Sequence, residues 1–212
     1  SYEVIYEEYT ALSAQIQAGE FAVDEGLACD MYEELVQLTA QHGFHQYEVA
    51  NFAREHRTSN IEHPTPISHL PSPNSIPAFA SRHNINYWRG GSCYGLGPSA
   101  TSYVRGVRTK NWANTQLYCE QLERGQRAIE MTEELPPLRR AGEIAAFGLR
   151  MNAGWPFGQF TETTGYDLRG EWSAEIDELV AEGFGRADAE GFQLTPHGLR
   201  FADFAAEKFL RT

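Results

Sequence analysis

Proline breaks this chain of 212 residues into separate parts, and no other feature limits its possible folds as strongly. Between residues 55 and 80 lie Pro64, Pro66, Pro71, Pro73 and Pro77. Serines, asparagines and histidines stand between them, and no periodic apolar face is present. Because proline lacks the backbone N–H that helices and sheets use, we predict a flexible loop here. A second break at Pro136-Pro137 separates a C-terminal module.

The first part, residues 1–54, combines helical and strand patterns. Apolar side chains share one face of residues 25–42 at helical spacing, where Asp24 can cap the start and Gly43 can end the helix. A shorter helix is expected from Thr10 to Gly19, and residues 44–52 alternate enough for a strand. A helix followed by a strand fits the closing stage of an α/β barrel, so we expect part of such a barrel here.

The middle part, residues 81–135, is expected to contain two strands and one helix. The predicted strands are Ile85–Trp88 and Ala100–Val107, joined by a glycine-rich turn. Gly95 and Gly97 in this turn would let the backbone bend tightly or approach a ligand. Asn114 can cap a helix that runs through residue 124.

The C-terminal module, residues 136–212, has the order of elements of a winged helix. Helices are expected over residues 138–152 and 171–182, a hairpin over 184–194 and a last helix from the Thr195-Pro196 cap to Leu210. Winged helices often bind DNA, but residues 171–182 carry five acids and no base. Such a helix repels a phosphate backbone, so we do not expect DNA binding. The fold class predicted for the whole chain is α+β.

Composition argues against a membrane-spanning chain and against a disulfide framework. No apolar run approaches the roughly 20 residues that a membrane helix needs. Cys29, Cys93 and Cys119 are odd in number and far apart, which is typical of reduced thiols. We therefore expect a cytoplasmic location.

The net charge of −12 hides a basic segment. From Ser81 to Asn114 there are no acids and five bases, which are Arg82, Arg89, Arg105, Arg108 and Lys110. Such a segment can concentrate small anions while the acidic remainder repels polyanions. A solvated basic loop that faces acids elsewhere explains the pattern equally well.

The densest group of chemically useful side chains lies in residues 81–91. Its members are Arg82, His83, Asn84, Tyr87, Trp88 and Arg89. An imidazole can ligate a metal, aromatic rings provide stacking area and guanidiniums pair with carboxylates, as a large planar anionic ligand requires. On a strand, Tyr87 would share a side with His83, while Trp88 would pack in the core. By itself, however, such a stretch is more typical of a strand leading into a turn, with a structural His83.

Three motifs resemble those of one known family. His83-Asn84, two residues and then Tyr87-Trp88 resemble the HNxxYW motif of the HemW-type heme chaperones, which are radical S-adenosylmethionine (radical SAM) proteins. Tyr47–Arg54 resembles the family's YEISNFAR segment, and Tyr94–Ala100 resembles its YLGLGPGA loop. The motifs occur in the family's order. The related HemN branch has a similar glycine loop but lacks HNxxYW, so the resemblance favours the chaperone branch.

The resemblance implies a division of the chain into four regions. Residues 1–54 would end a radical SAM barrel and residues 55–80 would be a proline-rich insertion. Residues 81–135 would carry the HNxxYW motif and the glycine loop. Residues 136–212 would form a winged-helix-like HemN C-terminal domain.

The resemblance also implies a heme site and its partners. The heme-binding residues would be His83, Asn84, Tyr87 and Trp88, with His83 as an axial ligand or as a donor to a propionate. Arg82 and Arg89 would pair with propionates, and the loop residues Gly95, Gly97 and Ser99 would lie near the cofactor. Heme-acceptor proteins would be the partners, and a homodimer is possible.

S-adenosylmethionine and a [4Fe–4S] cluster are expected only in the complete parent protein. The family holds its cluster with CxxxCxxC, since three close thiolates must reach three irons, and this chain has no such trio. Whether the chain is part of an enzyme is therefore open. Two alternatives stand beside the chaperone. One is an oxygen-independent coproporphyrinogen III oxidase whose arginines grip propionates, and the other is a non-catalytic domain for protein contact.

Overall fold

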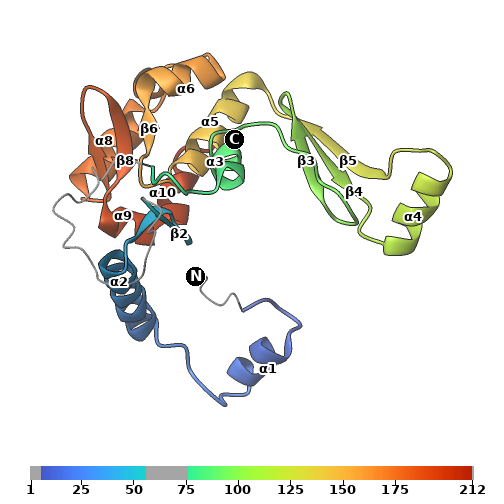
Figure 1. Cartoon of the computed structure of the whole chain (residues 1–212), viewed down its shortest axis with the longest axis horizontal. Coiled ribbons are helices and arrows are strands. Elements are labelled where there is room, and N and C mark those ends of the chain that lie inside the picture. Colours follow the sequence, from blue (N-terminus) through green and yellow to red (C-terminus); the bar gives the residue numbers. More distant parts are fainter. Residues whose placement is uncertain (1–5, 56–75, 212) are drawn as a thin grey trace. The chain divides into compact units, whose positions relative to one another are not determined.

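The computed structural model describes residues 6–55 and 76–211 (Figure 1). These residues form two compact units, one made of residues 6–55 with 76–80 and the other of residues 81–211. Most of the proline-rich segment, predicted to be a flexible loop, lies outside the described residues. Within the described part, no helix combines the length and the apolar character needed to cross a bilayer.

The first unit contains two helices and one hairpin. Helix α1 (Ala11–Gln17) is capped by Thr10, and α2 (Glu25–Gln41) is capped by Asp24, whose Oδ1 accepts from the Leu27 N–H at 2.9 Å. Both helices and the Asp24 cap confirm the predictions. The single strand predicted over residues 44–52 is wrong, because β1 (Phe44–Glu48) and β2 (Asn51–Arg54) pair as an antiparallel hairpin.

The buried carboxylate of Glu48 explains this hairpin turn. It accepts hydrogen bonds from the backbone N–H of Ala50 and from the side-chain amide of Asn51. A side-chain acceptor that satisfies the turn in this way lets the chain reverse after two residues. An alternating pattern of apolar residues cannot reveal such a turn.

The second unit begins with a helix where a strand was expected. Helix α3 (Arg82–Trp88) occupies the segment predicted as a strand, and that prediction is wrong. The strand predicted over residues 100–107 is also corrected, because the chain reverses within it. Strands β3 (Thr101–Val104) and β4 (Val107–Asn111) pair around a turn at Arg105-Gly106, where φ is +51° and +86°. Two positive φ values are typical of a hairpin turn whose twist matches its strands.

A third strand completes this sheet. Helix α4 (Thr115–Glu123) follows β4 and is capped by Asn114, as predicted. Strand β5 (Ile129–Glu134), which was not predicted, then pairs with β4 to give the order β3-β4-β5. Figure 1 shows α4 at the end of this sheet that lies away from α5 (Pro137–Gly148).

The C-terminal module contains a helical cluster and a small sheet. After α5 come β6 (Trp155–Pro156), α6 (Phe157–Thr164), α7 (Leu168–Glu171) and α8 (Ser173–Ala181). Strands β7 (Gly185–Ala187) and β8 (Gly191–Leu194) form the predicted hairpin, and β6 adds to it in the order β6-β8-β7. The Thr195 cap is confirmed, but the last helix breaks at Phe201 into α9 (Pro196–Arg200) and α10 (Ala202–Glu207).

An aromatic core holds this module together. Its fully buried rings are Trp155, Phe160, Trp172, Phe192 and Phe209. Small residues of α5 make room for them, since a Cβ at Gly148 would lie 2.0 Å from the Trp155 indole nitrogen. Both buried indoles donate hydrogen bonds, Trp155 to the Ala145 carbonyl and Trp172 to the Phe209 carbonyl. A close-packed core whose two buried indole N–H groups are satisfied gives α3 a rigid support.

Candidate functional site

Capping and two glycines define α3. The Ser81 hydroxyl accepts from the Asn84 N–H at 3.3 Å and begins the helix. Gly90 follows it with φ +72°, a left-handed conformation that glycine adopts without strain. A Cβ at Gly91 would lie 2.0 Å from the Asn86 side chain, so a larger residue there would have to displace that side chain. That side chain donates to the Ser92 carbonyl at 3.0 Å, so Asn86 fixes the exit from the helix.

His83 and Tyr87 lie on one exposed face of α3. Their ring centroids are 4.8 Å apart and their planes meet at 86°, an edge-to-face pair. The two rings were expected on the same side, and they are. The reason is helical spacing of four residues rather than the alternation of a strand. The face presents an accessible imidazole beside a phenol ring that is 41% exposed.

Cys93 follows α3 in the chain and influences the Tyr87 side chain. Interaction with the Cys93 side chain, first through hydrogen bonding and then through charge, raises the pKa of Tyr87 above its ordinary value, and burial adds to this rise. Cys93 itself is buried and forms a β-bridge with Tyr103, with N···O distances of 2.7 and 2.9 Å. The thiol is thereby tied to β3. Nothing in the sequence motif points to this residue.

Trp88 faces the C-terminal module. Its ring centroid lies 6.3 Å from that of Phe147 on α5, and the Arg150 guanidinium carbon lies 5.3 Å from the centre of the Trp88 ring. The indole Nε1 is buried and has no hydrogen-bond partner among the described residues. Trp88 thus packs on α5, away from the exposed rings of His83 and Tyr87.

The two arginines that flank α3 differ in their surroundings. Arg82 is exposed. Arg89 donates to the Gly154 carbonyl at 2.6 Å and its guanidinium lies 4.4 Å from the centre of the Trp155 ring. Burial lowers the pKa of Arg89 to about 10, so it stays charged at neutral pH. Arg89 holds α3 on the C-terminal module, whereas Arg82 is free to meet an anion.

The glycine loop is held by side chains that the motif does not contain. The Asn111 amide donates to the carbonyls of Gly95 and Gly97, at 3.2 and 2.9 Å. The Gly97 N–H donates to the Tyr118 hydroxyl at 3.2 Å. A Cβ at Gly95 would lie 2.5 Å from the Thr101 backbone, so this position needs glycine for close approach.

These contacts turn the loop's larger side chains outward. Tyr94 is 77% exposed and Leu96 is 87% exposed, next to the predicted cofactor-proximal residues Gly95, Gly97 and Ser99. Cys93 directly precedes Tyr94, and its bridge to Tyr103 of β3 fixes the start of the loop. Sequence reasoning missed Asn111 and Tyr118, since only strand pairing and the position of α4 bring them to the loop.

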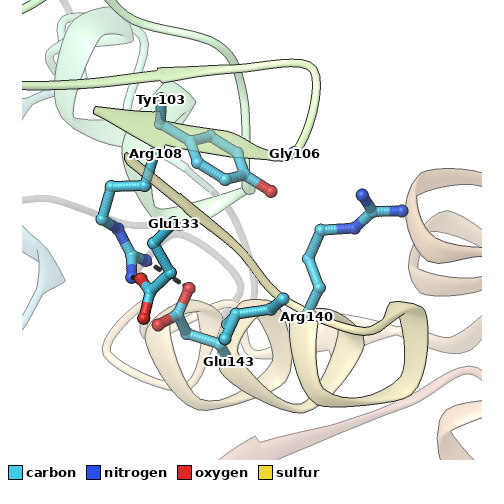
Figure 2. Close-up of a pocket in the computed structure, with 7 residues that line it drawn as sticks. Tyr103, Gly106, Arg108, Glu133, Arg140 and Glu143 are labelled. Atoms are coloured by element: carbon cyan, nitrogen blue, oxygen red, sulfur yellow. Dashed lines mark hydrogen bonds and ion pairs between the residues drawn. The ribbon is translucent and has the colours of Figure 1, made fainter. Parts of the chain in front are cut away.

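The basic segment does not form one positive surface. Figure 2 shows Arg108 between Glu133 of β5 and Glu143 of α5, and it forms ion pairs with both. Burial opposes the charge of Arg108, but its hydrogen bonds and ion pairs with Glu143 and Glu133 raise its pKa overall. The alternative explanation of the basic segment, that its bases face acids elsewhere in the chain, is therefore confirmed for Arg108.

A small crevice surrounds this ion pair (Figure 2). It is lined by Tyr103, Gly106, Arg108, Glu133, Leu135, Arg140 and Glu143, and it has no enclosed volume that a water molecule could enter. Typical ligand pockets enclose about 300–1,000 Å³. None of the predicted heme-binding residues lines this crevice. A heme at α3 would therefore lie against the exposed face and not inside this cavity.

The described residues do not fit a [4Fe–4S] cluster. Cys29 lies in α2, Cys93 in the bridge to β3 and Cys119 in α4. In the part of the chain that the structure covers, no three ligand side chains are placed to share a metal ion. A cluster that needs three neighbouring thiolates finds no site on these residues.

Comparisons with known proteins agree with the motifs. Residues 135–201 match the HemN C-terminal domain. The chain is 26% identical over 210 residues to the heme chaperone HemW of Lactococcus lactis, covering 99% of this chain and 49% of that protein. It is 31% identical over 219 residues to the mitochondrial radical S-adenosyl methionine domain-containing protein 1 of Mus musculus, covering 95% of this chain and 43% of that protein.

One solved structure shares the fold. It is that of the coproporphyrinogen III oxidase HemN from Escherichia coli, a radical SAM enzyme, with a TM-score of 0.58 at 14% identity. The match covers 85% of this chain and 40% of the solved chain. The chain spans about half the length of the curated relatives it matches. The chain therefore has a region, residues 135–201, that matches the HemN C-terminal domain, is distantly homologous over most of its length to the HemW heme chaperones, and shares the fold of HemN.

Proposed function

We propose that this chain is the heme-binding part of a HemW-type heme chaperone, which takes up heme and passes it to acceptor proteins. The observation that carries the proposal is the exposed pair of His83 and Tyr87 on α3. A neutral imidazole is a common axial ligand of heme iron, and an adjacent aromatic ring offers contact area to a porphyrin. An exposed site suits a protein that must release its cargo.

Each predicted site residue has a role in this proposal. His83 ligates the iron or donates to a propionate, and Tyr87 contacts the porphyrin. Arg82, exposed at the start of α3, pairs with a propionate. Asn84 contributes its amide near the capped first turn, while Trp88 and Arg89 hold α3 against the C-terminal module.

The glycine loop would supply the second wall of the site. Gly95, Gly97 and Ser99 shape it, and the exposed side chains of Tyr94 and Leu96 offer apolar area to the tetrapyrrole. The bridge between Cys93 and Tyr103 of β3 fixes the start of the loop, which would help the loop keep its place when heme binds.

The proposal extends to the parts of a complete protein. Residues 1–54 would end a radical SAM barrel, with residues 55–80 as an insertion, and residues 136–212 would be a winged-helix-like cover that does not bind DNA. S-adenosylmethionine and a [4Fe–4S] cluster would be held by parts outside this chain. A cytoplasmic location and a homodimer remain predictions.

The chaperone is preferred over the oxidase for two reasons. Several relatives that match most of this chain are named heme chaperones, whereas the likeness to the solved oxidase stands at 14% identity. The HNxxYW pattern at His83 and Trp88 also belongs to the chaperone branch that the chain resembles.

Heme titration tests the proposal. Adding hemin to the purified chain should produce a shifted Soret band, and His83→Ala should weaken binding by about tenfold or more, because it removes a contact worth at least about 1.4 kcal/mol. His42→Ala is the matched control, since His42 is also exposed but lies at the end of α2. Equal Soret spectra and affinities for His83→Ala and the unchanged chain would refute His83 as the ligand.

A further inference from the structure

We infer that Arg108 is a positioning residue of the candidate site, because its ion pairs with Glu133 and Glu143 fix the angle between the sheet that carries the glycine loop and the helix α5 that supports α3. This angle is a property of the chain without ligand. Its consequence for heme rests on the proposed function.

The glycine loop is part of the sheet β3-β4-β5 as a rigid body. The Gly95 N–H donates to the Ser102 hydroxyl of β3 at 2.9 Å. The Asn111 amide of β4 donates to the carbonyls of Gly95 and Gly97. The Gly97 N–H donates to the Tyr118 hydroxyl of α4 at 3.2 Å. Because two strands and α4 all hold the loop, it should move together with the sheet and α4.

Helix α3, in contrast, is supported by α5. A Cβ at Gly90, which follows α3, would lie 2.9 Å from the Ile144 side chain, so the backbone approaches α5 closely. The Trp88 ring centroid lies 6.3 Å from that of Phe147, three positions after Ile144 and on the same side of α5. The two walls of the candidate site therefore belong to two bodies, α3 to α5 and the glycine loop to the sheet.

Two stretches of chain connect these bodies. The first leads from α3 to Cys93, which pairs with Tyr103 at the outer edge of β3. The second leaves the sheet at its other edge, where β5 ends at Glu134 and α5 begins at Pro137. Two connections still allow the sheet to rotate about the line that joins them. Only a further contact away from that line fixes the angle.

Arg108 makes such a contact. It lies on the central strand β4, in one row with Tyr103 of β3 and Glu133 of β5, and this row faces α5 (Figure 2). Its guanidinium pairs with Glu133 at 2.5 Å and also with Glu143 of α5. Since a helix rises roughly 1.5 Å per residue, Glu143 lies about 9 Å along α5 from Pro137 and thus away from the second connection.

The environment of the pair makes it effective. The Arg108 and Glu143 side chains are 25% and 20% exposed, so solvent and salt screen them less than a surface pair. Glu133 holds the guanidinium from the side of the sheet and aims it at Glu143. Arg140 of α5 also approaches the sheet, at Gly106, but that contact joins a long side chain to backbone, whereas a guanidinium–carboxylate pair is directional.

The experiment measures the distance between α4 and α3 in the full chain without heme, by electron paramagnetic resonance of two nitroxide labels. One label is attached to native Cys119, which is exposed on α4, and the other to Arg82→Cys at the exposed start of α3. Cys29→Ser removes a competing thiol, while Cys93 is buried. Figure 1 shows α4 at the end of the sheet away from α5, so a small change of angle displaces its label strongly.

Arg108→Met and Glu143→Gln should both displace and broaden the distribution of distances, because each removes one charge of the pair and nearly keeps the length of the side chain. Arg124→Met is the matched control, since Arg124 pairs with Glu120 within α4, and it should leave the distribution unchanged. Glu143→Gln replaces a single side-chain atom, so it decides the question even if Arg108→Met does not fold.

Exchanging the charges provides a rescue. Arg108→Glu alone should displace the distribution, because it brings three carboxylates together. Arg108→Glu combined with Glu143→Arg again places one guanidinium beside two carboxylates and should restore the original distances. Equal distributions for Glu143→Gln and the unchanged chain would overturn the inference, and so would a charge exchange that leaves the distances displaced.

Hemin titration separates this inference from the proposed function. If hemin binds through His83, Arg108→Met should lower the affinity several-fold and leave the Soret maximum in place, because the iron ligand is kept and only the loop is displaced. An unchanged affinity would refute the consequence for heme. If the label distances respond but the unchanged chain does not bind hemin, the proposed function fails and the positioning by Arg108 stands.

Discussion

Ser99 adopts a left-handed backbone conformation, with φ +61°, in the middle of the glycine loop. For a residue with a Cβ this conformation costs about 1–2 kcal/mol. The loop motif that the chain resembles, YLGLGPGA, has glycine at the corresponding place. Gly97, two residues earlier, has φ +98° and no neighbouring atom that a Cβ would meet. The two positions form a natural pair for testing backbone strain.

Ser99→Gly should raise the free energy of unfolding by about 0.5–1 kcal/mol, because relief of the left-handed strain exceeds the added freedom of the unfolded chain. Gly97→Ala should lower the free energy of unfolding by about 1 kcal/mol, because the Cβ of alanine makes the left-handed conformation unfavourable. Urea unfolding followed by circular dichroism measures both. A destabilised Ser99→Gly variant would show that the Ser99 side chain stabilises the loop in another way.

Among the helices, the sequence predicted three capping residues correctly, but it did not predict that residues 82–88 form the helix α3. Asp24, Asn114 and Thr195 each accept the backbone hydrogen bond that their position predicted. In α3 the apolar residues at 85, 87 and 88 do not distinguish a short helix from a strand. Its Ser81 cap and the left-handed Gly90 decide for a helix, and these signals are weak in a segment of seven residues.

The end of the chain is tied to α8 through Arg211. Its guanidinium donates to the Glu175 carboxylate at 2.6 Å and to the Glu171 carbonyl at 2.7 Å, and lies 5.0 Å from the centre of the Trp172 ring. Burial raises the pKa of Glu175, but the hydrogen bond from Arg211 and other contacts outweigh it, so the pKa of this carboxyl is lowered overall. The ionised form of Glu175 therefore stabilises the fold.

The ion pair between Arg211 and Glu175 predicts that stability depends on pH. A carboxyl whose pKa is lower in the folded state stabilises the protein above its unfolded pKa, near 4.5, and this contribution is lost as the pH falls through the folded pKa. Glu175→Gln should destabilise the chain by less than about 1 kcal/mol at pH 7, because the pair is partly solvated. The difference from the unchanged chain should vanish in acid. Thermal unfolding between pH 7 and pH 3 measures this, with exposed Glu162→Gln as the control, and a difference independent of pH would contradict it.

Within the second unit, the half-buried side chain of Arg89 joins the candidate site to the C-terminal module. Arg89 ends α3, donates to the Gly154 carbonyl and lies over Trp155 of the aromatic core. Gly90 adds to this junction, since a Cβ there would lie 2.9 Å from Ile144 of α5. The stability of α3 should therefore depend on the module behind it.

Arg89→Ala should lower the free energy of unfolding by about 2–3 kcal/mol, the combined size of a buried cation–π contact and a charged hydrogen bond. Arg89→Lys should have a stability between those of Arg89→Ala and the unchanged chain, because an ammonium keeps the charge but not the planar stacking. Arg82→Ala, an exposed neighbour at the other end of α3, should change stability little. Urea unfolding of the three variants provides the measurement, and equal effects of Arg82→Ala and Arg89→Ala would contradict the junction.

The sequence by itself determined the local features of this protein: the capped helices, the C-terminal hairpin and the motifs that relate the chain to HemW and HemN. These depend on neighbours within a few positions, whose spacing is visible in the printed order of residues. Only the tertiary structure decided which side of α3 is exposed, that Cys93 is bridged to Tyr103 of β3, that Asn111 holds the glycine loop, and that Arg108 is paired with acids. Those contacts join residues far apart in the chain, and they arise from strand pairing and core packing, which no local pattern encodes.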